Sequence, residues 1–180
     1  MILAGGRGRR MGGGKPARML AGRPLAAYPA AALVAVCGRV VVVCKPSTEV
    51  PLDLERWEEP SARSHPAVGI AHALERAGEA VLVCAADMPF VTADACSALI
   101  AGLAPGRSAS VAFAEGRLQP VFGCYAVAAL PAFTAAGEGG GALTAAVASL
   151  DPVLVSLPAA VVRSVDTPED LAAAARQLDE

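Results

Sequence analysis

Continuous apolar runs mark the strands that this chain is expected to form. The runs RVVVVC at 39–44 and AVLVC at 80–84 have the length and β-branched content of strands buried on both faces of a sheet. Later apolar runs at 108–114 and 119–127 predict a further pair of strands. The chain also opens on a short apolar segment, Ile2-Leu3-Ala4, which predicts a first strand.

Alanine-rich segments separate these runs and predict helices over 26–36, 68–78 and 92–103, with a closing helix from about Pro168. Thr92 is a suitable N-cap for the third helix because its hydroxyl can accept a backbone hydrogen bond. Strands that alternate with helices are typical of parallel sheets. We therefore predict an α/β fold, a three-layer sandwich with a mostly parallel, Rossmann-like sheet.

Composition limits the classes of function. The chain has 180 residues and no long linker, so we expect residues 1–180 to form a single domain. Hydrophobic residues make up 54%, charged residues 18%, and the formal net charge is -2. This balance is typical of a soluble enzyme and argues against nucleic-acid or membrane partners. Five cysteines without metal-binding spacing indicate reduced thiols, and hence a cytoplasmic protein.

A glycine-rich and cationic segment follows the predicted first strand. In α/β sheets ligands bind beyond the carboxyl ends of strands, which is where this segment begins. Gly5 and Gly6 allow close approach of the backbone to an anion, and nearby side chains add positive charge. These basic residues are Arg7, Arg9, Arg10, Lys15 and Arg18. The segment predicts a triphosphate ligand; a disordered basic N-terminus is the alternative.

Two familiar phosphate-binding motifs do not fit this segment. A Walker A loop fails around Gly14-Lys15, because Arg9 and Pro16 stand where the motif needs a glycine and a serine or threonine. The dinucleotide fingerprint GxGxxG begins at Gly6 but has Met11 in place of its last glycine. The acid expected further along that fold is also missing, which disfavours a Rossmann oxidoreductase.

Asp87 follows the predicted strand at 80–84, at the edge where the cationic segment is expected. A polyphosphate beside a carboxylate requires a divalent cation between them, and Mg²⁺ commonly binds one or two carboxylates together with phosphate oxygens. We therefore expect Asp87 to bind Mg²⁺, with Asp166 as a candidate second ligand. The alternative for both residues is a turn or helix cap.

Five motifs resemble those of one enzyme family. LAGGRGRRMGGGK at 3–15 resembles the LAGGxxxRMGxxK signature of the molybdenum cofactor guanylyltransferases, which are MobA-like nucleotidyltransferases. Further similar segments follow in the family's order: GRPL at 22–25, HPAVGI at 65–70, AADMPF at 85–90 and SVDTPEDLA at 164–172. The resemblance implies Mg²⁺-dependent transfer of GMP from GTP to molybdopterin, with release of pyrophosphate. The form LAGG, rather than LAAG, favours GTP over CTP.

The resemblance also assigns roles to individual residues. The catalytic candidates are Arg10 and Lys15, which would neutralise the triphosphate, and Asp87. The nucleotide-binding candidates are Leu3, Ala4, Gly5, Gly6, Lys15, Glu59 and Asp87, with Cys44 or Lys45 nearby. The metal candidates are Asp87 and Asp166. The carboxylate of Glu59 can accept both N1–H and the 2-amino group of guanine, although a solvated surface acid is the alternative.

Two departures from the family bear on specificity. His65 stands where the family usually has glycine, and we expect a surface histidine there, with a position beside the base as the alternative. GEGGG at 137–141, expected to be a mobile loop, stands where relatives often carry arginines that meet the acceptor.

Rival functions are a cytidylyltransferase for the same cofactor, a nucleotidyltransferase for another phosphorylated acceptor, and a nucleotide-binding protein without turnover. The resemblance also implies that the product passes to a molybdoenzyme or a cofactor-insertion protein.

Overall fold

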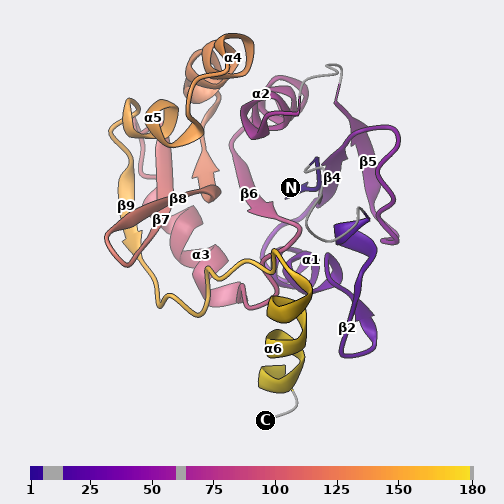
Figure 1. The fold of residues 1–180 in the computed structure, drawn as a ribbon. Coiled ribbons are helices and arrows are strands. Elements are labelled where there is room, and N and C mark those ends of the chain that lie inside the picture. The colour runs from indigo at the N-terminus through magenta and orange to yellow at the C-terminus, as the bar shows by residue number, and fades with distance from the viewer. Residues whose placement is uncertain (6–13, 60–63, 179–180) are drawn as a thin grey trace.

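A central seven-stranded sheet organises the chain, and Figure 1 shows helices on both sides of it. The computed structural model describes residues 1–5, 14–59 and 64–178. In spatial order the strands are β5 (Glu55–Glu58), β4 (Val41–Cys44), β1 (Ile2–Leu3), β6 (Val81–Ala85), β8 (Arg117–Tyr125), β7 (Ala109–Ala114) and β9 (Val153–Ser156). Among these strands β8 alone runs antiparallel to its neighbours, so the sheet is mostly parallel, as predicted.

Two groups of helices cover the two faces of the sheet. One face carries α2 (Pro66–Ala77), α4 (Leu130–Gly139) and α5 (Leu143–Ala148). The other carries α1 (Ala27–Val34) and α3 (Ala93–Gly102). Ile70 and Phe133 are fully buried in the first core, and Leu33 and Leu99 in the second. The predicted three-layer α/β sandwich is therefore confirmed.

The strands predicted from continuous apolar runs are buried on both faces. Along β4, Val42 and Cys44 face the α1–α3 core, whereas Val41 and Val43 face the opposite core. The helix predicted over 92–103 is also present as α3, and the side chain of its N-cap Thr92 accepts a hydrogen bond from the backbone of Ala95 at 3.2 Å.

The C-terminal helix α6 (Pro168–Leu178) lies beside a small hairpin of β2 (Met19–Leu20) and β3 (Arg23–Pro24) (Figure 1). A separate apolar cluster joins them. Its buried members are Leu20, Leu25, Val165 and Ala174. This cluster holds the start of α6 near the short 3₁₀ helix η2 (Lys15–Ala17), which lies within the cationic segment.

The expectation of a mobile loop at 137–141 is wrong for residues 137–139. Residues Gly137–Gly139 form the last turn of α4, and the helix ends at Gly140, which has a left-handed φ of 68°. A glycine suits this helical position because α4 packs tightly on α2: a Cβ atom at residue 137 would lie 3.0 Å from Cγ2 of Val68.

The residues that follow the parallel strands β1, β4, β5 and β6 lie at one edge of the sheet. Beyond β1, Ala4 N–H donates to the Val43 carbonyl at 2.9 Å, and Ala86 N–H donates to the Leu3 carbonyl at 3.0 Å. Beyond β5, Glu59 N–H donates to the Cys44 carbonyl at 3.0 Å. The carboxyl ends of β1, β4, β5 and β6 therefore form a continuous edge, where this fold places ligands.

All five cysteines are free thiols. In the ranges that the structure describes, no helix has the length and apolar character needed to cross a bilayer.

Candidate active site

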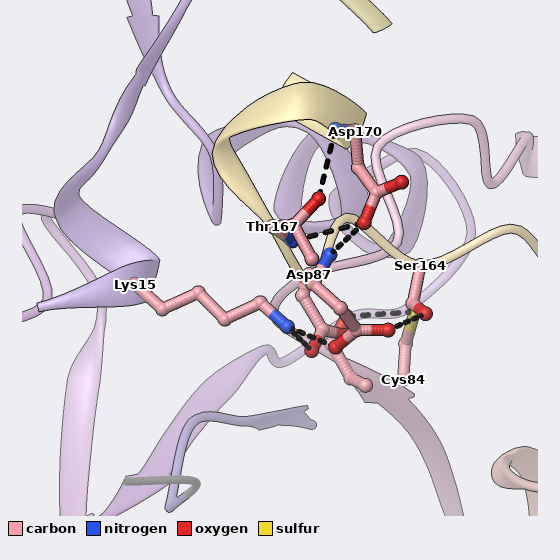
Figure 2. A network of polar contacts seen from close by, with 8 residues as sticks. Lys15, Cys84, Asp87, Ser164, Thr167 and Asp170 are labelled. Carbon is pink, nitrogen blue, oxygen red and sulfur yellow. Dashed lines mark hydrogen bonds and ion pairs between the residues drawn. The ribbon is translucent and has the colours of Figure 1, made fainter. Parts of the chain in front are cut away.

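Lys15 lies between two carboxylates at the carboxyl edge of the sheet. Its Nζ atom is 2.6 Å from Oδ2 of Asp87 and 2.6 Å from Oδ1 of Asp166. Figure 2 shows the extended lysine side chain reaching Asp87, which follows β6. The lysine side chain is only 12% exposed, compared with 27% for Asp87 and 48% for Asp166. Three segments that are far apart in the sequence thus meet at one ammonium group.

The local backbone explains why Lys15 reaches this position. Gly14 adopts a left-handed conformation, with φ 61°, that glycine enters without steric cost, and the chain then enters η2. Pro16 is buried, and its carbonyl accepts a hydrogen bond from Ala26 N–H at 3.1 Å. The turn that carries Lys15 is therefore attached to the start of α1.

Asp87 is attached to the C-terminal segment as well as to the sheet. Its backbone carbonyl accepts a hydrogen bond from Val165 N–H at 2.9 Å. The neighbouring Met88 side chain is buried, with 2% of its surface exposed. This link holds the residues before α6 against the end of β6, and so brings Asp166 beside Asp87.

A capping network orients Asp166. Asp170 Oδ2 accepts hydrogen bonds from the backbone N–H groups of Asp166 at 3.0 Å and Thr167 at 2.9 Å (Figure 2). Asp170 N–H in turn donates to Oγ1 of Thr167 at 3.1 Å, which makes a reciprocal cap at the start of α6. Ser164 Oγ donates to Oδ2 of Asp166 at 2.6 Å. Thr167 and Asp170 perform the capping, so the Asp166 carboxylate turns towards Lys15.

The electrostatics of the cluster favour a charged lysine. Burial disfavours the ammonium form, but the charge of Asp87 and the hydrogen bonds to Asp166 and Asp87 outweigh this cost. The pKa of Lys15 is consequently raised above its ordinary value of 10.5. Lys15 is therefore a cation at neutral pH.

The two carboxylates fit a hard divalent cation. Both already direct an oxygen at one positive group, and Mg²⁺ in proteins commonly binds one or two carboxylates plus substrate phosphates. Within residues 1–5, 14–59 and 64–178, no group of three or more histidine, cysteine, aspartate or glutamate side chains is placed to hold a metal. Magnesium sites of this kind complete their coordination with water and substrate phosphates.

A second ion pair lies on the same edge. Glu59, at the end of β5, is 5% exposed, and its Oε2 lies 2.6 Å from Nζ of Lys45. Its Oε1 packs so closely on Gly5 that a Cβ atom there would collide with it. Cys44 is instead buried in the core, so Lys45 is the member of this neighbouring pair that reaches Glu59. Glu59 is thus not the solvated surface acid of the alternative interpretation.

His65 is half-buried at the start of α2, so the expected surface histidine stays a prediction. It is the N-cap of α2, and its Nδ1 accepts a hydrogen bond from Ala67 N–H at 3.2 Å. Together with Leu3, Gly5 and Glu59, it lines a small cavity of about 50 Å³. The alternative, a histidine near the bound base, stays a prediction.

The structure also places other predicted residues. Leu3 and Ala4 are 8% and 3% exposed, so their side chains belong to the core. Gly6 and Arg10 lie outside the described residues. Ser164 was not predicted as a site residue, because its spacing to Asp166 carries no recognisable signal.

A larger cavity of about 440 Å³ is lined by residues such as Cys37 and Leu103, and contains none of the predicted site residues.

The chain is similar to known proteins over most of its length. Residues 1–153 match the family model of the MobA-like NTP transferase domain. The molybdenum cofactor guanylyltransferase of Cereibacter sphaeroides is 35% identical over 147 residues, covering 77% of this chain and 75% of the relative. That of Bradyrhizobium sp. (strain ORS 278) is 31% identical over 138 residues, covering 71% of this chain and 65% of the relative. The chain thus matches slightly less than two thirds of the latter's length.

The fold has a similar counterpart among solved structures. Molybdopterin-guanine dinucleotide biosynthesis protein A from Archaeoglobus fulgidus superposes with a TM-score of 0.78 at 24% identity, covering 99% of each chain. At this identity the likeness shows that the two chains share one α/β fold. The chain belongs to the MobA-like NTP transferase domain family, which its sequence motifs resemble.

Proposed function

We propose that this protein is a Mg²⁺-dependent nucleotidyltransferase that transfers GMP from GTP to a molybdopterin-type cofactor and releases pyrophosphate. The observation that carries the proposal is the meeting of Lys15 with Asp87 and Asp166 at the ligand edge of the sheet. This arrangement supplies an ammonium group for phosphate oxygens and two carboxylates for a metal. Both relatives described above are molybdenum cofactor guanylyltransferases, which supports the same reaction.

The chemistry requires no nucleophile from the protein. A phosphate oxygen of the acceptor attacks the α-phosphorus of GTP in line, and the bond from that phosphorus to the bridging oxygen of pyrophosphate breaks. The protein acts by alignment and by stabilising charge. Lys15 donates hydrogen bonds to the triphosphate and balances the charge that develops on the leaving group. Asp87 and Asp166 would hold Mg²⁺, which when bound neutralises phosphate oxygens.

The Lys45–Glu59 pair favours guanine as the base. Glu59 lies beside Gly5, in the segment expected to approach the nucleotide. Its carboxylate can accept hydrogen bonds from guanine N1–H and the 2-amino group, two adjacent donors that cytosine does not present. Lys45 holds the carboxylate in place from the end of β4. These contacts support GTP rather than CTP as the donor.

The test is pyrophosphate release with molybdopterin as acceptor and either GTP or CTP as donor. We expect release with GTP, and a loss of about a hundred-fold or more in Asp87→Asn, the usual effect of removing a preorganised charge contact. Asp94→Asn is the matched control, because Asp94 is exposed on the first turn of α3. Preference for CTP would make the protein a cytidylyltransferase. Nucleotide binding without release for any phosphorylated acceptor would indicate a binding protein.

A further inference from the structure

Lys15 contacts the two carboxylates that are the candidate ligands of a divalent cation. Its ammonium touches one oxygen of Asp87 and one of Asp166, each at 2.6 Å, and it is largely shielded from solvent. A metal ion bound to these two oxygens would lie beside the ammonium and be repelled by it. The lysine and the metal therefore compete for the same carboxylates.

We propose that Lys15 is an exchangeable cation that couples metal binding to nucleotide binding. Without nucleotide, Lys15 bridges Asp87 and Asp166 and keeps divalent ions from this pair. A nucleoside triphosphate draws the ammonium onto its own oxygens and so frees the carboxylates for the metal. This inference rests on the proposed function, because it takes a nucleoside triphosphate as the second partner of the lysine.

The energetics of the two ion pairs of Lys15 support this order. To bind a metal ion alone, the protein must break two charge-assisted hydrogen bonds from Lys15. The ammonium, on a side chain that is only 12% exposed, would then lose both carboxylate partners, and such an unpaired charge is costly. Triphosphate oxygens accept the same hydrogen bonds and remove this cost. By linkage, the metal must then also tighten nucleotide binding.

The surrounding contacts indicate that the lysine is the part that moves. Asp166 is held through its backbone by Asp170 and through Oδ2 by Ser164. The backbone of Asp87 is held by Val165. Lys15 carries its charge on a flexible four-carbon stem, which can turn to a second partner without displacing the main chain.

The experiment measures Mn²⁺ binding to the nucleotide-free protein by electron paramagnetic resonance, with Mn²⁺ as the probe for Mg²⁺. We expect weak binding to the wild type and about ten-fold tighter binding to Lys15→Gln, within the usual range of coupling between sites. Lys15→Met, whose side chain has a similar length, should behave like Lys15→Gln. Lys15→Arg keeps the charge and should keep Mn²⁺ binding weak.

Arg107→Gln is the matched control, because it removes one positive charge from the ion pair with Asp151, which has no role in the candidate site. It should leave Mn²⁺ binding as in the wild type. The proposal is overturned if the wild type binds Mn²⁺ as tightly as Lys15→Gln and Lys15→Met, or if Arg107→Gln strengthens binding equally.

A non-hydrolysable GTP analogue completes the test. It should tighten Mn²⁺ binding to the wild type much more than to Lys15→Gln, and equal tightening in both proteins would refute the coupling. If the lysine substitution weakens the fold, the melting temperature provides a second readout: Mn²⁺ should raise it in Lys15→Gln but hardly in the wild type. These measurements need no turnover. Failure of GMP transfer would therefore refute the proposed function while leaving the Mn²⁺ result to decide the exchange.

Discussion

The carboxylate of Asp170 accepts a hydrogen bond from the backbone N–H of Asp166 at 3.0 Å, and so fixes the residue that shares Lys15 with Asp87. The same oxygen caps α6 through Thr167 N–H at 2.9 Å. Asp170 does not touch Lys15 in any contact that the structure describes; it positions Asp166. One carboxylate thus supports both the stability of the last helix and the geometry of the candidate site.

Asp170→Ala is expected to lower the free energy of unfolding by about 1 kcal/mol, the typical effect of losing a helix cap. It should also reduce pyrophosphate release, because Asp166 loses its backbone anchor. Glu169→Gln is the control, since the exposed Glu169 precedes it in the same first turn. Chemical denaturation and turnover of both variants test this role. Unchanged turnover in Asp170→Ala, with the helix cap lost, would contradict it.

The stability of the protein should also depend on the ionisation of Asp170. Hydrogen bonds from the Asp166 backbone and then the Thr167 side chain lower the pKa of Asp170 below its ordinary value of 3.8. The unfolded chain therefore binds a proton more readily than the folded one. The ionised Asp170 carboxylate therefore adds to the free energy of unfolding. This contribution is complete above pH 3.8, and it disappears as the pH falls through the lower pKa of the folded state.

The measurement is the free energy of unfolding of the wild type and Asp170→Asn between neutral pH and the acid limit of the fold. The difference between the two proteins should be constant at neutral pH and should shrink in the acid range. A difference that stays constant down to the lowest accessible pH would show that ionisation of Asp170 does not contribute.

The strands that could be predicted from the sequence are those whose burial gives a clear hydrophobic pattern. The run at 41–44 is apolar throughout because helices cover both faces of β4. β5 was missed because Trp57 is its one buried residue, and the charged residues around it are typical of an exposed edge strand. β9 was missed for a similar reason, since Leu154 is 50% exposed.

The site was predictable only in part. The meeting of the Gly5 segment with Asp87 follows from adjacent parallel strands, whose carboxyl ends share an edge. The bridging of Asp87 and Asp166 by Lys15 was not predictable. It depends on the path of the C-terminal segment across the end of β6, which is held by the hydrogen bond from Val165 to the Asp87 carbonyl.

The cysteines should differ sharply in reactivity. Burial raises the pKa of Cys96 to about 12 and that of Cys124 to about 11, so at pH 8 very little thiolate forms at either. Burial also raises the pKa of Cys84, and Cys44 is fully buried. Cys37 is half-buried, so we expect it to react first with a thiol reagent.

Titration of the native protein with a chromogenic disulfide should show one fast thiol, followed by slow reaction of the others as the protein unfolds. Cys37→Ser should remove the fast phase. A fast phase that survives this substitution would show that the buried thiols open more readily than their packing indicates.

Lys45 and Glu59 offer a test of how burial determines the energy of an ion pair. The side chain of Glu59 is 2% exposed and that of Lys45 16% exposed. Lys45→Met would leave the Glu59 carboxylate buried without this cation. Removing one partner of a buried pair typically lowers the free energy of unfolding by about 3 kcal/mol. Glu59→Gln should cost less, because Lys45 retains some access to water. The double variant should be more stable than the sum of the single effects predicts.

Arg107→Met is the matched control, because Arg107 and Asp151 form an ion pair at 3.2 Å whose side chains are 40% and 90% exposed. Removing a pair of this exposed kind should cost no more than about 1 kcal/mol. Denaturant unfolding of the four variants, with the slopes compared to confirm the same unfolding transition, measures these energies. If Lys45→Met lowers the free energy of unfolding as little as Arg107→Met does, the Glu59 carboxylate must accept hydrogen bonds from water or another donor in the folded protein. Its carboxylate would then be less confined than a group that orients a bound guanine requires.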